Sequence, residues 1–239
     1  DGGKYRGVDA ALKRAEQMQR EGAAILDIGG ESTRPGYTPV SDEEEMERVI
    51  PVIEAIKKRL DIPISVDTYK SRVAEAAIMA GADLINDIWG LKADPDMAKV
   101  IAKHKTACCL MHNRENTEYQ DFMQDMMFDL QETIALAKQA GIEADKIILD
   151  PGVGFAKSYE QNLTAIREMD KLHELGYPVL LGTSRKSVIG LSLDLPVDER
   201  VEGTLVTTVL AVQKGCGFVR VHDVKENYRA IQMAKILCQ

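Results

Sequence analysis

The chain has 239 residues, 45% of them hydrophobic and 28% charged, which is the composition of a globular protein long enough to bury a substantial core. Thirty basic against 38 acidic residues give a net charge of −8, and only 5% of the residues are aromatic. These values, together with the absence of a basic run, exclude a typical nucleic-acid partner. No apolar run approaches the roughly 18–20 residues that cross a bilayer, so we expect no membrane segment.

Four cysteines are spread along the chain without a C-x-x-C pair: Cys108, Cys109, Cys216 and Cys238. Cys108 and Cys109 are adjacent and lie inside an apolar run. This usage predicts reduced thiols in a cytoplasmic protein and neither a disulfide framework nor a cysteine metal site.

Short apolar runs alternate with longer amphipathic stretches from one end of the chain to the other. Seven runs have the length and the near-continuous apolar character of strands buried on both faces. These runs span residues 23–28, 62–66, 83–88, 106–111, 146–149, 178–181 and 217–221. Helical periodicity and capping signals predict eight helices. They begin near residues 5, 41, 70, 94, 120, 158, 198 and 224.

Strict alternation of strands and helices predicts a parallel sheet with right-handed crossovers. Eight helices in a chain of this length indicate a (β/α)8 barrel, and the absence of a polar linker indicates one domain over residues 1–239. With only seven strands, the order is α-(βα)7, so we expect the first strand of the barrel to be missing from the sequence. The alternative is a doubly wound open sheet, but no G-x-G-x-x-G turn follows a first strand.

Polar residues end every predicted strand, which is where the active site of a barrel lies. Asp67, Asn86 and Asp150 follow apolar runs and offer acceptors for N–H groups of a ligand. The last two strands end in basic residues, with Lys186 after one and Arg220 and His222 after the other. Because anions bind at the loops after the last two barrel strands, we expect a ligand with a phosphate or pyrophosphate end and a ring with a guanidine-like edge. The alternative for Arg220 is a structural ion pair with a neighbouring carboxylate.

Six segments, in order, resemble the motifs of the dihydropteroate synthase family. The segments are G-G-E-S-T-R-P-G (29–36), I-S-V-D-T (64–68), I-N-D-I (85–88), D-P-G-V-G-F (150–155), G-T-S-R-K-S (182–187) and R-V-H-D (220–223). The resemblance implies a TIM barrel that condenses 6-hydroxymethyl-7,8-dihydropterin pyrophosphate with p-aminobenzoate. The products are 7,8-dihydropteroate and pyrophosphate, in folate biosynthesis. Sulfonamides inhibit this family.

The resemblance also implies a role for each matching residue. Six residues would bind the pterin, with Asp67 and Lys186 also catalytic: Asp67, Asn86, Met111, Asp150, Phe155 and Lys186. Arg220 and His222 would bind the pyrophosphate. Thr33 and Arg34 would lie on a loop that closes over the site, and Ser187 would meet the carboxylate of p-aminobenzoate.

Magnesium is implied by the resemblance, although no metal ligand is assigned within this sequence. The metal- and pyrophosphate-binding asparagine of the family lies on its first strand, upstream of Asp1-Gly-Gly. We therefore expect a gap, one strand wide, between the last strand and the strand that begins at Ala23. The family also implies a homodimer.

Three other functions are compatible with parts of the pattern. A corrinoid-dependent methyltetrahydrofolate methyltransferase shares the barrel and the pterin pocket but would not need the S-T-R-P-G, S-R-K-S and R-V-H segments. A Schiff-base aldolase could use Lys186, but no second lysine or tyrosine is placed to tune it. A non-catalytic pterin-binding barrel would need no intact set of site residues. His112 is the candidate general base by position, and we expect it to be simply hydrogen-bonded instead.

Overall fold

The computed structural model describes residues 7–32 and 38–238, so Thr33 and Arg34 lie outside the described residues. Within them, all seven predicted strands are confirmed. They are β1 (Leu26–Gly29), β2 (Ile64–Asp67), β3 (Leu84–Asp87), β4 (Ala107–Met111), β5 (Ile147–Asp150), β6 (Leu180–Leu181) and β7 (Phe218–Val219). The first five form a parallel sheet in sequence order, and β6 pairs with β7 in parallel. One bridge between Leu149 and Val179 connects the two sheets.

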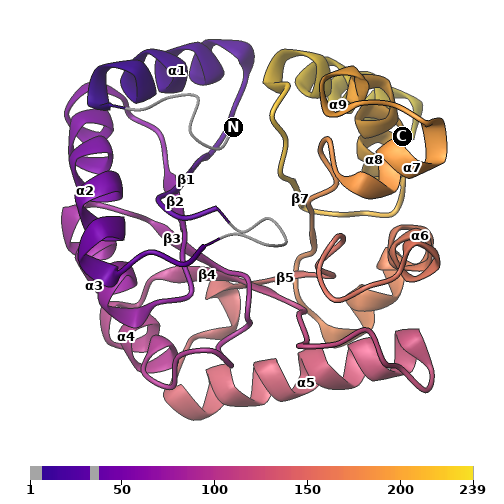
Figure 1. The fold of residues 1–239 in the computed structure, drawn as a ribbon, viewed down its shortest axis with the longest axis horizontal. Helices are drawn as coiled ribbons and strands as arrows, with labels where there is room; N and C mark the ends of the chain where they lie inside the picture. The colour runs from indigo at the N-terminus through magenta and orange to yellow at the C-terminus, as the bar shows by residue number, and fades with distance from the viewer. Residues whose placement is uncertain (1–6, 33–37, 239) are drawn as a thin grey trace.

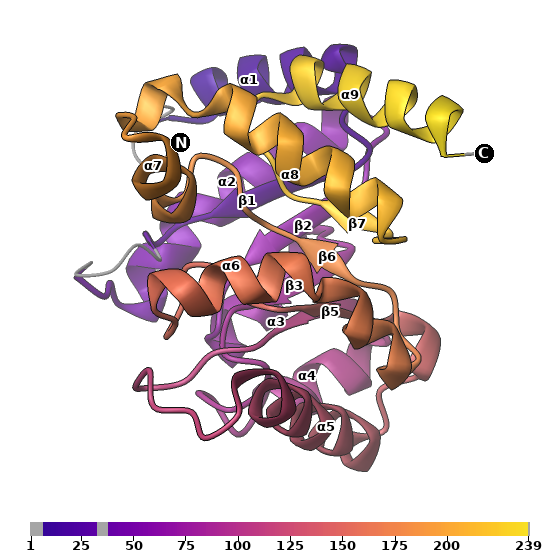
Figure 2. The same cartoon turned by 90° about the vertical axis from the view of Figure 1, so that its right-hand side faces the viewer.

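Helices surround the strands on the outside, as expected for a barrel (Figure 1). The α-helices of the described residues are α1 (Val8–Glu21), α2 (Asp42–Arg59), α3 (Ser71–Ala80), α4 (Met97–His104), α5 (Phe122–Ala140), α6 (Tyr159–Arg167), α7 (Ser187–Leu193), α8 (Val201–Gln213) and α9 (Val224–Leu237). The described residues also contain three 3-10 helices, which are η1 (Ala144–Lys146), η2 (Met169–Leu175) and η3 (Val197–Glu199). Figure 2 shows α6 and α8 on the outer side of the strands, with α9 lying beside α8 and α1.

Burial explains why the strand runs do not alternate in polarity. Every residue of β2, β3 and β5 is buried, because the barrel interior covers one face and the helices cover the other. Ile64, Ile85 and Leu149 are fully buried members of the main hydrophobic core. The rigid strands therefore fix the positions of the polar residues at their carboxyl ends.

The helix count is wrong, and the helices predicted to begin near residues 94 and 224 have no aspartate side chain as a cap. Helix α7 was not predicted, because its seven residues directly follow the S-R-K turn and are too few to show a helical period. Asp94 does not begin α4, which starts at Met97; its carboxylate instead accepts from the backbone N–H of Ser71 at the start of α3. Asp223 caps no helix with its side chain, because it pairs with Arg185. Ser158 makes the predicted capping box with Gln161.

The edges of the two sheets do not pair with each other within the described residues. No backbone hydrogen bond joins β1 to β7, and side chains span this edge instead. Arg220 Nε donates to Asp27 Oδ2 at 2.6 Å, and Arg14 Nη2 donates to the carbonyl oxygen of His222 at 2.9 Å. This is the edge at which we expect a further strand, and that expectation stays a prediction.

Candidate active site

The register of the sheet brings four of the predicted site residues to one end of the barrel. Asp67 lies opposite Asn86 in the β2–β3 pair, and Met111 lies opposite Asp150 in the β4–β5 pair. All four are buried. Because each is the last or next-to-last residue of its strand, the predicted pterin-binding acceptors form one row around the barrel mouth.

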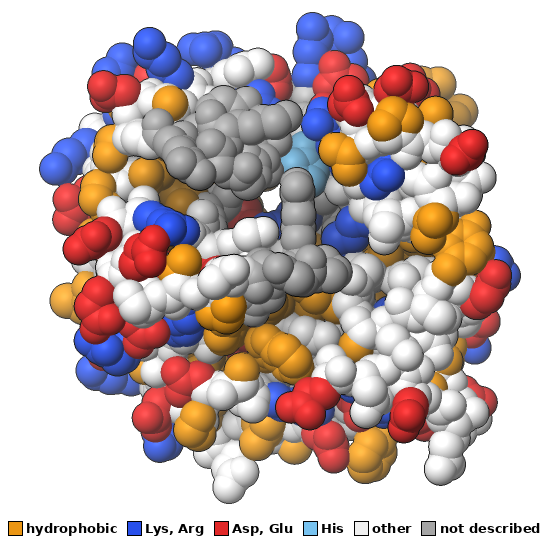
Figure 3. Space-filling model, in the orientation of Figure 1, with side chains coloured by type: hydrophobic (Ala, Val, Ile, Leu, Met, Phe, Trp, Pro, Cys, Tyr) orange, Lys and Arg blue, Asp and Glu red, His pale blue; other side chains and the backbone are white. Residues whose placement is uncertain are grey.

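Gly182, which follows β6, marks the point where the acidic and the basic side chains meet. A Cβ atom at Gly182 would lie 3.8 Å from Asp150 Oδ2, 3.9 Å from Lys186 Nζ and 3.8 Å from Arg220 Cβ. The structure therefore brings together residues that β5, α7 and β7 position. Figure 3 shows this face of the molecule hollowed at its centre, with lysine or arginine and histidine surfaces around the hollow.

Arg220 makes the structural ion pairs that the sequence left open as an alternative. Besides the bond to Asp27, its Nη2 donates to Asp67 Oδ2 at 2.7 Å. Its side chain is still 42% exposed, so the guanidinium has a free side toward solvent. Asp27 was missed by sequence reasoning as a site residue. The signal was its place near the end of the first apolar run, two residues before the start of the G-G-E-S-T-R-P-G segment.

Asp67 has one carboxylate oxygen with no partner among the described residues. Its Oδ1 atom is buried and accepts no hydrogen bond, whereas Oδ2 is bound by Arg220. Burial raises the pKa of Asp67 well above its ordinary value, although the charge of Arg220 opposes this shift and that of Asp27 adds to it. A buried acceptor without a donor is costly, so this atom is suited to an N–H or protonated group of a ligand.

Asp150 and Lys186 are connected through the loop after β5. Asp150 Oδ1 accepts from the backbone N–H of Gly152 at 2.7 Å, and burial raises the pKa of this carboxyl. Lys186 Nζ donates to the carbonyl oxygen of Val153 and lies 4.9 Å from the ring centroid of Phe155. Burial lowers the pKa of Lys186 to about 8, against the charge of Asp150. The loop thus holds a carboxylate, an ammonium group and an aromatic face together.

His222 lies two residues beyond Arg220, and its Nδ1 atom is 2.9 Å from Ser184 Oγ. Burial and the charge of Arg220 lower the pKa of His222 to about 4, so the ring is neutral at neutral pH. The attraction for an anion therefore comes from Arg220 and Lys186, with His222 as a hydrogen-bonding group. Ser187 is exposed as the first residue of α7.

His112 is hydrogen-bonded on both ring nitrogens, as expected. Its Nε2 atom is 2.8 Å from Asp129 Oδ2, and Lys157 Nζ is 2.9 Å from its Nδ1. Neither Lys157 nor Asp129 was singled out by sequence reasoning. Burial lowers the pKa of His112 to about 4.

The described residues do not by themselves form a magnesium site. They contain no group of three His, Cys, Asp or Glu side chains arranged to hold a metal ion. The carboxylates of Asp27 and Asp67 are both bound by the guanidinium of Arg220.

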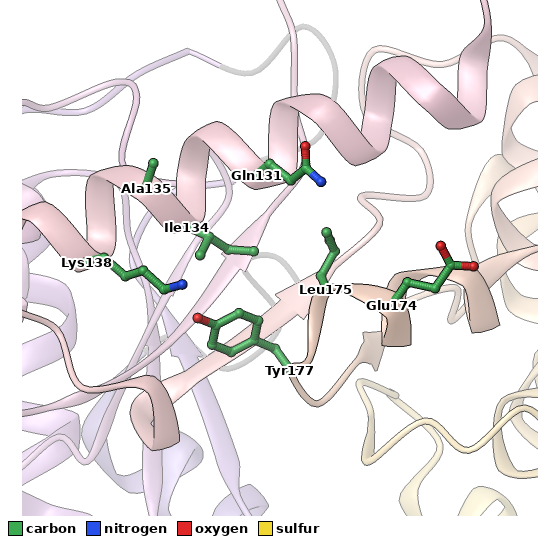
Figure 4. A pocket seen from close by; sticks show the side chains of 7 residues that line it. All are labelled: Gln131, Ile134, Ala135, Lys138, Glu174, Leu175 and Tyr177. Carbon is green, nitrogen blue, oxygen red and sulfur yellow. The ribbon is translucent and has the colours of Figure 1, made fainter.

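A second hollow, of about 320 Å³, lies away from these residues (Figure 4). It is bordered by the C-terminal half of α5, the end of η2 and Tyr177, which precedes β6. It therefore lies toward the amino ends of the strands, where barrel enzymes do not place their chemistry.

Known proteins are similar to this chain over almost its whole length. A family model described as pterin binding enzyme matches residues 1–222. The dihydropteroate synthase of Clostridium beijerinckii is 60% identical over 238 residues, which cover 99% of this chain and 88% of the relative. That of Bacillus subtilis is 56% identical over 233 residues, with coverages of 98% and 82%. The chain belongs to the dihydropteroate synthase family.

Solved structures of dihydropteroate synthases confirm the barrel. The Clostridium difficile protein, determined in the presence of pteroic acid, matches with a TM-score of 0.96 and 49% identity over 99% of this chain and 90% of that one. The Yersinia pestis protein in complex with a sulfonamide drug matches with a TM-score of 0.95 and 40% identity, with coverages of 99% and 88%.

Membership of the dihydropteroate synthase family confirms the predicted activity. The chain is a transferase of folate biosynthesis that joins the pterin pyrophosphate to p-aminobenzoate. The corrinoid-dependent methyltransferase and the non-catalytic barrel are not retained as alternatives.

Among the described residues, no helix combines the length and the apolar character needed to cross a bilayer.

Proposed function

We propose that the dihydropteroate synthase reaction of this chain takes place at the carboxyl ends of β2 to β7, with the residue roles that the sequence predicts. The observation that carries the proposal is the convergence of Asp150, Lys186 and Arg220 around Gly182. This arrangement offers N–H acceptors on one side and cations on the other. It matches a substrate that has a pterin ring at one end and a pyrophosphate at the other.

The pterin ring is held by the acceptors of β2, β3 and β5. A carboxylate accepts two parallel N–H bonds from a guanidine-like edge, and the proposal gives this role to Asp150. Asn86 offers both a donor and an acceptor to the ring. Met111 and Phe155 supply apolar contact, and Lys186 donates to the pterin. The unpartnered Oδ1 of Asp67 supports a further polar contact on the ring.

Bond breaking starts at the carbon that carries the pyrophosphate. The C–O bond to pyrophosphate breaks, the leaving oxygen keeps the electron pair, and Arg220 with His222 stabilises the charge that develops on it. The electron-rich pterin shares the positive charge left on the carbon, and the carboxylates of Asp67 and Asp150 favour that charge. Because these groups act where charge develops, they stabilise the transition state of the reaction more than the bound substrate and so lower the activation barrier.

Bond formation uses the amine of p-aminobenzoate. Its nitrogen attacks the same carbon, and the resulting N–C bond leaves an acidic N–H whose proton passes to solvent or to pyrophosphate. No strong general base is required, which agrees with the paired state of His112. Ser187 binds the carboxylate of p-aminobenzoate, together with Thr33 and Arg34, which lie outside the described residues.

A rate measurement with the two substrates tests the residue roles. We expect wild-type protein to release one pyrophosphate for each dihydropteroate formed, and Asp67→Asn to lower kcat at least tenfold while the protein remains folded. Unchanged turnover in that variant would remove Asp67 from the catalytic groups. Glu174→Gln, which changes a carboxylate at the hollow near Tyr177, is the matched control and should leave kcat unchanged.

The proposal also includes Mg²⁺ as a cofactor, a cytoplasmic location and inhibition by sulfonamides. The similarity to dihydropteroate synthases supports Mg²⁺ dependence, which dialysis against EDTA and readdition of Mg²⁺ would test. The free thiols of Cys108, Cys109 and Cys216 suit a reducing compartment. The sulfonamide complex of the Yersinia pestis protein supports inhibition of this chain by the same drug class.

A homodimer through the last helices is also part of the proposal. Helices α7, α8 and α9 are neighbours and expose large apolar side chains, with Leu191, Val206 and Ile236 each about two-thirds exposed. Apolar clusters of this kind usually mark an interface. We expect Val206→Lys to convert a dimer into a monomer in sedimentation equilibrium, whereas a wild-type monomer would refute the dimer.

A further inference from the structure

The loop that follows β5 has a sharply bent backbone. Gly152 and Gly154 have φ angles of +68° and +88°, and Ala156, which is not a glycine, has a φ of +44°. A Cβ atom at Gly152 would lie only 2.0 Å from the carbonyl oxygen of His112. The loop therefore crosses directly over the end of β4 in a conformation that local preferences do not favour, so other contacts must hold it.

Lys157 supplies such contacts from the end of this loop. Its Nζ atom donates to the carbonyl oxygens of Gly152 and Phe155, both at 3.0 Å, and to Nδ1 of His112 at 2.9 Å. An ammonium group has three N–H donors and no acceptor, so all three donors are used. The carbonyls that the bend turns toward Lys157 are thereby satisfied.

The chemistry of the ammonium group also fixes the state of His112. When Lys157 is protonated it can only donate, so Nδ1 of His112 is then the acceptor and the ring proton is on Nε2. That N–H donates to Asp129 Oδ2 on α5, which also accepts from Arg114 Nε at 2.5 Å. A continuous chain of hydrogen bonds thus runs from α5 through a buried imidazole to the loop after β5.

The same loop holds the residues that the proposed function gives to the pterin. Gly152 donates its backbone N–H to Asp150, the Val153 carbonyl accepts from Lys186, and Phe155 lies beneath the Lys186 ammonium group. Lys157 itself does not contact these side chains in any described hydrogen bond. It acts on them through the loop backbone, and its charge also lowers the pKa of the Asp150 carboxyl.

We propose that Lys157 is a positioning residue for the pterin site, because its ammonium group ties the loop after β5 to His112 and so fixes the backbone that places Asp150, Lys186 and Phe155. This inference rests on the proposed pterin-binding roles of those three residues and deepens them. Burial lowers the pKa of Lys157 to about 7, so the ammonium form that makes the three contacts loses its proton as the pH rises through this value.

The test compares pterin binding in variants that break different links of the chain. Pteroic acid is the probe, and its affinity is measured by isothermal titration together with the KM of each substrate. Lys157→Met keeps the length of the side chain and removes all three donors. Lys171→Met is the matched control, because Lys171 is exposed on η2, where it pairs with Glu168. Circular dichroism and the Tm report whether each variant is folded.

We expect Lys157→Met to weaken pteroic acid binding at least tenfold and to raise the KM for the pterin substrate more than the KM for p-aminobenzoate. Lys171→Met should change neither value more than twofold. A folded Lys157→Met protein with a lower Tm but wild-type affinity and KM would overturn the inference, since a merely structural lysine predicts that result.

Two variants of His112 keep the inference testable if Lys157→Met fails to fold. The side-chain amide of His112→Asn reaches the position of Nδ1 and can accept from Lys157, whereas that of His112→Gln reaches the position of Nε2 and can serve only Asp129. We expect pteroic acid affinity within threefold of wild type for the asparagine and at least a tenfold loss for the glutamine. Equal affinities in the two folded variants would overturn the inference.

The wild-type protein separates the two proposals. A wild-type chain that binds no pteroic acid overturns the proposed pterin site, and this inference with it. A wild-type chain that binds pteroic acid and turns over, beside a folded Lys157→Met variant that does both equally well, overturns the inference alone.

Discussion

Arg220 donates from Nη2 to the buried carboxylate of Asp67 at 2.7 Å, although 153 positions separate the two residues in the chain. Through this bond and its bond to Asp27, Arg220 links β7 to the first two strands. Both carboxylates raise the pKa of Arg220, so the guanidinium is always charged. The ion pairs orient the guanidinium, and its exposed side remains available to an anionic ligand.

Arg220→Ala should weaken binding of the pterin pyrophosphate far more than binding of the bare hydroxymethyl pterin. The proposed contact is with the leaving group, and a charge-assisted hydrogen bond contributes about 1.5–3 kcal/mol, or roughly 10- to 150-fold in affinity. Titration of both ligands into the variant measures this difference. Equal weakening of the two ligands would make Arg220 purely a structural partner of Asp27 and Asp67.

Asp150→Asn should weaken pterin binding at least tenfold. The amide keeps the size of the carboxylate, but one of its two acceptor positions becomes a donor that faces the donors of the pterin edge. We expect a loss of about 1.5–3 kcal/mol or more in pteroic acid affinity. Asp145→Asn, on the exposed segment before β5, is the control. Unchanged affinity in Asp150→Asn would refute its role.

The strands and their polar ends could be predicted because both depend on local sequence. A run such as I-I-L-D (147–150) encodes burial and the carboxylate that ends it. The contact of Asp27 with Arg220, and those of Asp129 and Lys157 with His112, could not be predicted, because the partners lie on different elements of the barrel. Arg220 and Asp27, for example, are 193 positions apart. Only closure of the barrel brings such side chains together.

Gly152→Ala should destabilise the protein more than Gly141→Ala. Both glycines have a positive φ, +68° and +89°, so both variants carry the backbone strain of a left-handed alanine. Only Gly152 also faces a carbonyl oxygen 2.0 Å from its Cβ position, whereas nothing lies within 4 Å of that position at Gly141.

The difference between the two variants therefore measures the clash alone. We expect Gly152→Ala to lower the free energy of unfolding by about 1–3 kcal/mol more than Gly141→Ala in urea denaturation. It should also weaken pteroic acid binding, because the displaced loop holds Phe155 and Lys186. Similar stabilities of the two variants would show that the loop backbone moves to accommodate the added methyl group without a loss of stability.

His112 should make the free energy of unfolding fall as the solution becomes acidic. Burial lowers the pKa of His112 from 6.5 to about 4, and the charge of Lys157 acts in the same direction, while Asp129 opposes it. Between these two values the unfolded chain binds a proton that the folded protein does not. The stability that His112 contributes is therefore complete above pH 6.5 and is lost as the pH falls toward 4.

The expected size follows from about 1.4 kcal/mol for each pH unit, which gives about 2 kcal/mol lost between pH 6.5 and pH 5. Urea denaturation at pH 7.5 and pH 5 should show this loss in the wild type. In His112→Asn the side chain cannot titrate, so the free energy of unfolding should fall by about 2 kcal/mol less than in the wild type. Asp67 acts in the opposite direction, because its raised pKa stabilises the fold as the pH falls, but it is present in both proteins and cancels in the comparison. The same pH dependence in both proteins would mean that the His112 imidazole takes up its proton in the folded state as readily as in the unfolded chain.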